Sequence, residues 1–261
     1  MKFLRKETDY LAGFSSILLK CFFISTCLSQ GIIISLMLIK NTRLAVNKFL
    51  KGRNSKFIFL EKSFKNRPFK LLDVGVGNHS ASKTVSLFPN CEYYGVDLNK
   101  DYNNSEEDFK VMKCFYEMDL TRLDFHLIPD GHFDGIWIVH VIEHLHNGDR
   151  VIESLTKKLK AGGYMYVEYP GIKSTKLPSM YGTLNFKDDL SHVRVYSVKE
   201  LTELFERNDC SVLKGGTRRN LYFILVAPFR ILSHWIRGKK LIGNMFWDIM
   251  GFAEYVYVRK G

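Results

Sequence analysis

The sequence contains little cysteine, and the positions of its thiols exclude several common kinds of site. Its 261 residues include five cysteines, an odd number, and no Cys-x-x-Cys pair or Cys/His ligand spacing occurs. This pattern predicts reduced thiols in a reducing compartment and no metal site. Internal repeats and low-complexity segments are also missing. Apolar and charged fractions of 46% and 25% are those of a globular protein, which excludes general disorder.

Acidic residues are scarce at both ends of the chain. Residues 1–60 hold 10 Lys/Arg and 2 acids, and residues 214–261 hold 9 and 2, whereas residues 61–213 carry a net charge of −4. A nucleic-acid enzyme usually gathers basic side chains around its active domain, so nucleic acid is not expected as a partner. Basic ends around a mildly acidic middle indicate attraction to an anionic membrane surface.

Charged residues are absent from positions 21–39, between Lys20 and Lys40. A run of about 20 apolar residues can cross a bilayer, although serine, threonine and glutamine dilute this one. The basic residues that follow it place the C-terminal bulk of the chain in the cytoplasm if the run spans. We therefore expect residues 1–60 to be a membrane-associated helical segment. The alternative is an apolar helix packed on the domain of a cytoplasmic protein.

Strand-like and helix-like segments alternate from Pro68 onward. Helical spacing of apolar residues covers 148–163 and 197–209. Strand-like runs cover 69–75, 92–98, 115–120, 133–142, 164–170, 210–216 and 253–261. This order predicts an α/β domain over 61–261 with a doubly wound, mostly parallel sheet of seven strands. The last two strands are separated by residues 217–252, which we expect to form a helical insertion.

The stretch LLDVGVGN ends the first predicted strand in a glycine turn. Gly75 and Gly77 allow the backbone to approach a ligand at the carboxyl end of the sheet. Asp73 precedes them, and a carboxylate there repels the pyrophosphate of a dinucleotide but suits a cationic ligand. An NAD(P)-binding oxidoreductase is therefore the less favoured interpretation. The second and third strands also end in acids, Asp97 and Asp119.

These features together resemble the class I S-adenosylmethionine-dependent methyltransferases, in particular their type 11-like group. LLDVGVGN, YYGVDL, EMDL, FDGIWIVHVIEHL and LKAGGYMYVEYPG follow one another in the order of that family's motifs. The resemblance covers about 68–213 and the last strand. One departure is His79, which stands where the family commonly has a third glycine.

The resemblance implies that S-adenosylmethionine is the cofactor. Asp73 would hold its ammonium group, Asp97 its ribose hydroxyls and Asp119 its adenine amino group. The remaining predicted cofactor-binding residues are Gly75, Val76, Gly77, Asn78, Leu98 and Leu120.

Three histidines are candidate general bases for a hydroxyl acceptor, because histidine accepts protons near neutral pH. We rank them His140, His192 and His144, with His140 first because it follows the fourth predicted strand. The acceptor is expected to be a hydroxyl or carboxyl of a small or lipid-linked, possibly glycan, molecule at the cytoplasmic membrane face. Aromatic and basic residues in the insertion favour a membrane-proximal acceptor.

Two alternatives stay open within this fold. They are a soluble small-molecule methyltransferase and a non-catalytic module that binds S-adenosylmethionine. The chain lacks the Asn/Asp-Pro-Pro-Tyr/Phe motif after the fourth strand, which further disfavours methylation of nucleic-acid bases. The sequence leaves the oligomeric state open.

Overall fold

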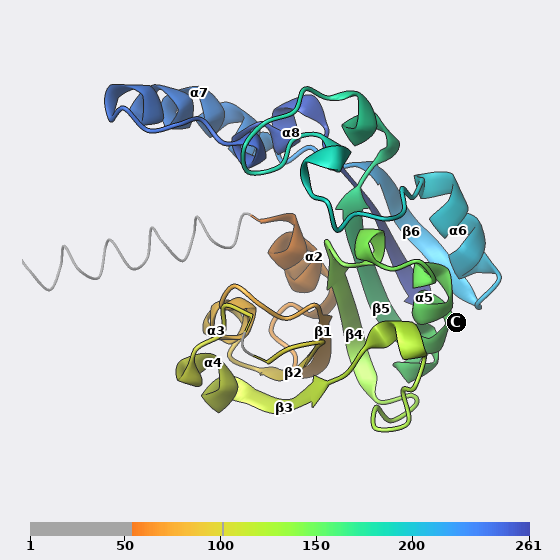
Figure 1. Cartoon of the computed structure of the whole chain (residues 1–261). Helices are drawn as coiled ribbons and strands as arrows, with labels where there is room; N and C mark the ends of the chain where they lie inside the picture. The colour runs from red at the N-terminus through yellow and green to blue at the C-terminus, as the bar shows by residue number, and fades with distance from the viewer. Residues whose placement is uncertain (1–53, 101) are drawn as a thin grey trace, which may run out of the picture. The chain divides into compact units, whose positions relative to one another are not determined.

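A seven-stranded sheet forms the centre of the computed structural model, which describes residues 54–100 and 102–261 (Figure 1). The strand order is β3-β2-β1-β4-β5-β7-β6. Neighbours from β3 to β5 pair in parallel, and β7 runs antiparallel to both β5 and β6. The strands are β1 (Phe69–Val74), β2 (Cys91–Asp97), β3 (Met112–Glu117), β4 (Phe133–Val139), β5 (Leu159–Pro170), β6 (Cys210–Thr217) and β7 (Ala253–Lys260). The predicted seven-stranded, mostly parallel sheet is confirmed.

Helices cover both faces of this sheet. The α-helices are α2 (Ser55–Phe64), α3 (Ser80–Leu87), α4 (Glu106–Val111), α5 (Gly148–Lys158), α6 (Val198–Glu206), α7 (Leu221–Ile236) and α8 (Trp247–Met250). One buried cluster joins the sheet to α5 and α6, through residues such as Ile152 and Phe205. A second cluster joins the opposite face to α2 and α3, through residues such as Leu60 and Ala81. The result is a layer of strands between two layers of helix.

The helix α2 belongs to this unit, although it lies across the boundary predicted between residues 60 and 61. Its aromatic face is buried on β5 and β7, where the Phe59 ring lies 4.9 Å from Tyr166 and 4.8 Å from Tyr257. The residues before it, including the apolar run 21–39, lie outside the described residues. Within residues 54–100 and 102–261, no helix is both long and apolar enough to cross a bilayer.

One helix boundary differs from the sequence prediction. The helical pattern extended to residue 163, but α5 ends at Lys158 and β5 starts at Leu159. Leu159 already pairs with Phe133 of β4. The strand therefore begins about one helical turn before Gly162 and Gly163, where the sequence pattern ends the helix.

Helical elements fill the connection between β6 and β7, as the sequence predicts for 217–252. They are α7, a short 3-10 helix (Gly243–Met245) and α8. Figure 1 shows α7 extending away from the sheet beyond α8. The N-terminal end of α7 is held against α8, because the backbone N–H of its N-cap residue, Asn220, donates to Asp248 Oδ1 at 2.8 Å.

Candidate active site

A cavity of about 510 Å³ opens at the carboxyl ends of β1, β4 and β5. It lies where strand order reverses between β1 and β4, which is where open α/β sheets bind their ligands. The walls come from the start of α2, from the loops after β1, β4 and β5, and from the insertion, which supplies Trp247 and Phe252. The site therefore combines elements from most of the described chain.

The glycine turn after β1 is held against neighbouring segments of the protein. The backbone N–H groups of Gly75 and Val76 donate to the carbonyl oxygen of Val96 on β2, at 2.9 and 3.3 Å. A Cβ on Gly75, whose φ is +76°, would overlap Val141, and one on Gly77 would lie 2.6 Å from the ring of Tyr102. Both glycines line the cavity, so any side chain here would also narrow it.

Asp73 lies at the end of β1 with its carboxylate buried at the cavity. Its Oδ2 atom accepts hydrogen bonds from Lys56 Nζ at 2.6 Å, from Ser80 Oγ at 2.5 Å and from Tyr93 OH at 2.5 Å. Sequence reasoning missed Lys56, because it lies 17 residues before Asp73 and belongs to no motif. The resulting ion pair offers an anion and a cation side by side, which complements the ammonium and carboxylate of an amino-acid zwitterion.

The acids on the next two strands lie along the same edge of the sheet but outside the lining of the cavity. Asp97 ends β2, and its carbonyl oxygen accepts from Met118 N just before Asp119, at 2.9 Å. Burial is the main cause that raises the pKa of Asp97, and the negative charge of Asp73 on the neighbouring strand raises it further. Hydrogen bonds from Thr121 lower the pKa of Asp119, whose carboxylate caps the short helix that follows.

The residue that replaces the family's third glycine turns its side chain out of the cavity. Asn78 and His79 have φ values of +53° and +58°, the left-handed region that glycine adopts most easily. His79 Nδ1 lies 2.7 Å from the buried carboxylate of Asp108, in the first turn of α4. Asn78 lines the cavity. The turn therefore keeps the conformation that the glycine pattern implies.

His140 lies between two buried carboxylates at the cavity wall. Its Nδ1 is 3.2 Å from Glu143 Oε1, and its Nε2 is 3.3 Å from Glu168 Oε1. Burial lowers the pKa of His140, but the hydrogen bond to Glu143 and the negative charges of Glu143 and Glu168 raise it more, to about 9. Arg218 Nη1 binds Glu168 at 2.6 Å and its Nη2 binds Asp248 at 3.0 Å. This network makes His140 an imidazolium at neutral pH.

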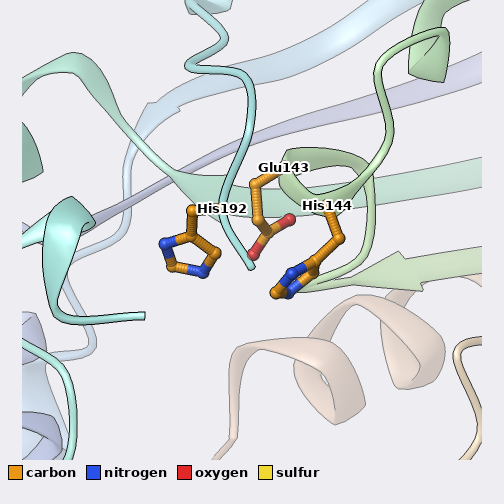
Figure 2. Close-up of side chains that lie close together, drawn as sticks. All are labelled: Glu143, His144 and His192. Atoms are coloured by element: carbon orange, nitrogen blue, oxygen red, sulfur yellow. The ribbon is translucent and has the colours of Figure 1, made fainter. Parts of the chain in front are cut away.

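The other two candidate histidines lie together beside Glu143, as Figure 2 shows. The rings of His144 and His192 are 4.8 Å apart. One ligand atom from each of the three side chains lies within 4.8 Å of the others, so the group is a candidate metal site. Glu143 and His144 belong to the 3-10 helix after β4 (Ile142–His144), whereas His192 comes from the loop before α6. The sequence predicted no metal, since the spacing between His144 and His192 matches no metal motif.

The cavity brings together seven of the predicted site residues and leaves five outside its lining. Those that line it are Asp73, Gly75, Gly77, Asn78, His140, His144 and His192. Those that do not are Val76, Asp97, Leu98, Asp119 and Leu120. Val76 and Leu120 are buried, whereas Leu98 is 67% exposed at the carboxyl edge of the sheet. The methionine end of the predicted cofactor site and the predicted bases therefore share one space.

Comparisons with known proteins agree with this geometry. A protein-family model described as "Methyltransferase domain" matches residues 46–214. A search of curated proteins gives no match.

Solved structures of methyltransferases share the fold at low sequence identity. A SAM-dependent methyltransferase from Archaeoglobus fulgidus has 20% identity and a TM-score of 0.51, over 81% of this chain and 93% of that one. A putative sarcosine dimethylglycine methyltransferase from Galdieria sulphuraria has 16% identity and a TM-score of 0.54, over 84% and 88%. Phosphoethanolamine N-methyltransferase 2 from Haemonchus contortus, in complex with S-adenosyl-L-methionine, has 16% identity and a TM-score of 0.57, over 79% and 52%.

The family match spans more than half of the chain and includes the glycine turn, all three strand-end acids and the three histidines. Together with the sheet order and the cavity beside Asp73, it shows that this chain belongs to the methyltransferase-domain family, as a class I S-adenosylmethionine-dependent methyltransferase.

Proposed function

We propose that this methyltransferase transfers the methyl group of S-adenosylmethionine to an oxygen atom of a small or lipid-linked acceptor at a membrane surface. The observation that carries the proposal is that the Asp73–Lys56 pair lines the same cavity as His140, His144 and His192. One end of this space suits the amino-acid part of the cofactor, and the other offers groups that can hold or deprotonate an acceptor.

The cofactor supplies a methyl group already activated by positive sulfur, so the protein has to bind and align the reactants and to remove a proton. We assign Asp73 to the cofactor's ammonium and Lys56 to its carboxylate, which they complement in charge. Asp97 is assigned to the ribose hydroxyls, because its partly buried carboxylate ends β2 close to Asp73. Asp119 is assigned to the adenine end, one strand further along the same edge.

His140 is a poor general base in this arrangement, because both of its ring nitrogens face carboxylates and its pKa is raised to about 9. We propose instead that His140 acts as a fixed positive charge that positions Glu143. In this proposal, His144 or His192, and not His140, accepts the acceptor's proton. His192 Nδ1 lies 2.7 Å from the carbonyl oxygen of Phe186, to which it donates, so its Nε2 has a free lone pair.

The exposed apolar face of α7 supports a membrane-proximal acceptor. Six of its large apolar side chains are more than half exposed: Leu221, Leu225, Phe229, Leu232, Trp235 and Ile236. The first five are spaced three or four residues apart and therefore lie on one side of the helix, and Ile236 follows Trp235 at its end. Arg237, Lys239 and Lys240 follow the end of the helix. An apolar stripe next to basic residues suits the interface of an anionic bilayer.

The insertion connects this apolar stripe to the cavity. Trp247 and Phe252 line the cavity, and the Trp247 ring lies 4.9 Å from the His140 ring. A lipid-linked acceptor held at the bilayer by α7 would therefore enter a space whose wall belongs to the same insertion. The apolar run 21–39 stays a predicted membrane segment outside the described residues.

The acceptor class can be tested by incubating the full chain with S-adenosylmethionine labelled on its methyl group and with membrane or soluble extracts. We expect a labelled product that partitions with lipids and whose label is stable as an ether or labile as an ester. A labelled product only in the soluble extract would support the soluble small-molecule alternative. Cofactor binding with no labelled product in either extract would support a non-catalytic module.

The membrane contact can be tested with vesicles containing anionic phospholipid. We expect Leu225→Ser with Phe229→Ser to weaken vesicle binding of the full chain about tenfold or more, because each buried apolar side chain contributes about 1.5–3 kcal/mol. Leu190→Ser is the matched control, since Leu190 is 97% exposed and lies outside α7. Equal binding by the wild type and the α7 variant would remove α7 from the membrane contact.

A further inference from the structure

Glu143, His144 and His192 form a compact group of ligand-type side chains beside the cavity. Each offers one ligand atom within 4.8 Å of the other two, and all three residues line the cavity (Figure 2). The bonds of nitrogen and oxygen ligands to a transition metal are about 2.0–2.2 Å long, so the ligand atoms of a tetrahedral ion lie about 3.3–3.6 Å apart. The group spans up to 4.8 Å, so it would have to contract by up to about 1.3 Å for all three ligand atoms to reach one ion.

Glu143 carries a second and independent sign of a bound cation. Its side chain is fully buried, and its Oε1 faces His140 Nδ1 at 3.2 Å. Its other carboxylate oxygen, Oε2, is buried and has no hydrogen-bond partner among the described residues. A buried carboxylate oxygen without a hydrogen bond is costly even when the other oxygen is paired, because it has lost its water and gained no donor in return. A metal ion at this oxygen would supply the missing partner.

Both histidines make their supporting hydrogen bonds through Nδ1, which leaves Nε2 as the nitrogen that can bind metal; Asp189 Oδ2 lies 3.9 Å from the Nε2 of His192. His192 donates from Nδ1 to the carbonyl oxygen of Phe186 at 2.7 Å. His144 Nδ1 lies 2.9 Å from Ser191 Oγ, whose hydroxyl donates to Asp189 Oδ1 at 2.5 Å. Because the Ser191 hydroxyl donates its only proton to Asp189, its oxygen accepts the hydrogen bond from His144 Nδ1. Each ring therefore carries its free lone pair on Nε2, and such hydrogen bonds from the opposite nitrogen are typical of metal-binding histidines.

We propose that Glu143, His144 and His192 bind a divalent transition-metal ion, with its open coordination positions facing the cavity. Two imidazoles and one carboxylate favour zinc, cobalt, iron or nickel over magnesium and calcium, which prefer all-oxygen sites. Resting on the proposed function, we further infer that an oxygen atom of the acceptor occupies one open position. With both Nε2 atoms bound to the ion, His144 and His192 would position the acceptor through the metal and would not accept its proton. A hydroxyl bound to such an ion would lose its proton to water in the cavity at lower pH than a free hydroxyl does.

The site can be tested on the full chain after removal of metal with a chelator. Titration with Co²⁺, followed by calorimetry and by visible absorption, should show one equivalent bound, and Mg²⁺ should bind far more weakly. His144→Gln and His192→Gln should each weaken Co²⁺ binding about 100-fold, since each removes one of three protein ligands. His126→Gln is the matched control, because His126 is an exposed histidine with a carboxylate partner, Asp124, outside the cavity lining. It should bind Co²⁺ as the wild type does.

Two further measurements separate the metal site from the transferase assignment. S-adenosylmethionine binding by both glutamine variants, at wild-type affinity, shows that they fold. If those folded variants bind Co²⁺ as tightly as the wild type, or if His126→Gln loses as much binding as they do, the metal site is overturned. A wild type that binds no Co²⁺ but methylates at full rate overturns the metal site and leaves the transferase intact. A wild type that binds Co²⁺ but not S-adenosylmethionine supports the metal site and refutes the proposed function.

Discussion

Replacing Asp73 with asparagine removes one negative charge at the point where the cavity meets the glycine turn, while the size of the side chain is preserved. In the wild type, Oδ2 receives donors from Lys56, Ser80 and Tyr93 at 2.5–2.6 Å. Breaking a buried ion pair costs about 3–5 kcal/mol. Because Lys56 borders the cavity and water can reach it there, we expect the free energy of unfolding to fall by the lower figure, about 3 kcal/mol.

The loss in ligand binding should be confined to the part of the cofactor that carries the ammonium group. A hydrogen bond to a charged group contributes about 1.5–3 kcal/mol. Asp73→Asn should therefore raise the Kd for S-adenosylmethionine about 10- to 150-fold. Adenosine has no ammonium group, so its Kd should change less than about twofold. Calorimetry with both ligands, on wild type and variant, measures the two effects separately.

The matched control is Asp130→Asn, because Asp130 pairs with Lys158 at 2.6 Å but does not line the cavity. It should leave both affinities unchanged. The assignment of Asp73 is refuted if Asp73→Asn binds S-adenosylmethionine as the wild type does, or if adenosine binding weakens by the same factor.

Two other predictions concern stability. The pKa of His140 is raised from 6.5 to about 9 by folding, so its stabilising contribution is complete below pH 6.5 and is lost as the pH rises toward 9; this amounts to about 3 kcal/mol. Urea unfolding at pH 6.5 and pH 9 should show this loss in the wild type but not in His140→Asn. Asparagine is chosen because it tolerates the positive φ of 56° at this position. Equal pH dependence of stability in both proteins would contradict the assignment of His140 as a protonated imidazolium. His79→Gly relieves about 1 kcal/mol of left-handed backbone strain but removes the contact with Asp108, which contributes about 1.5–3 kcal/mol. Thermal unfolding should therefore show a net loss of stability of about 1 kcal/mol, with unchanged cofactor affinity. A variant more stable than the wild type would show that the contact with Asp108 contributes little.

The succession of strands along the chain and the position of the glycine turn could be read from the sequence. Both depend on local signals: apolar runs of strand length, and Gly75 and Gly77 directly after the first run. The acids Asp73, Asp97 and Asp119 were found for the same reason, since each ends or follows a strand of a parallel sheet. Parallel strands bring such ends to one edge, so their neighbourhood follows from topology.

The partners of these residues could not be read in the same way. Lys56 reaches Asp73 only because the aromatic face of α2 packs on the sheet. His140 ranked first as a base on position alone, but its protonation depends on Glu143 and on Glu168, which lies 28 residues away on β5. A pKa is set by burial and by nearby charge, and neither is visible in a spacing pattern.

The sequence by itself determined the family, the sheet and the position of the glycine turn, because strand-length apolar runs and glycine turns are properties of short segments. Only the tertiary structure decided which side chains meet in the cavity. It paired Asp73 with Lys56, gave His140 its charge, and placed His192 beside Glu143 and His144. Those contacts join segments far apart in the chain, and their energies depend on how completely the fold excludes water from them.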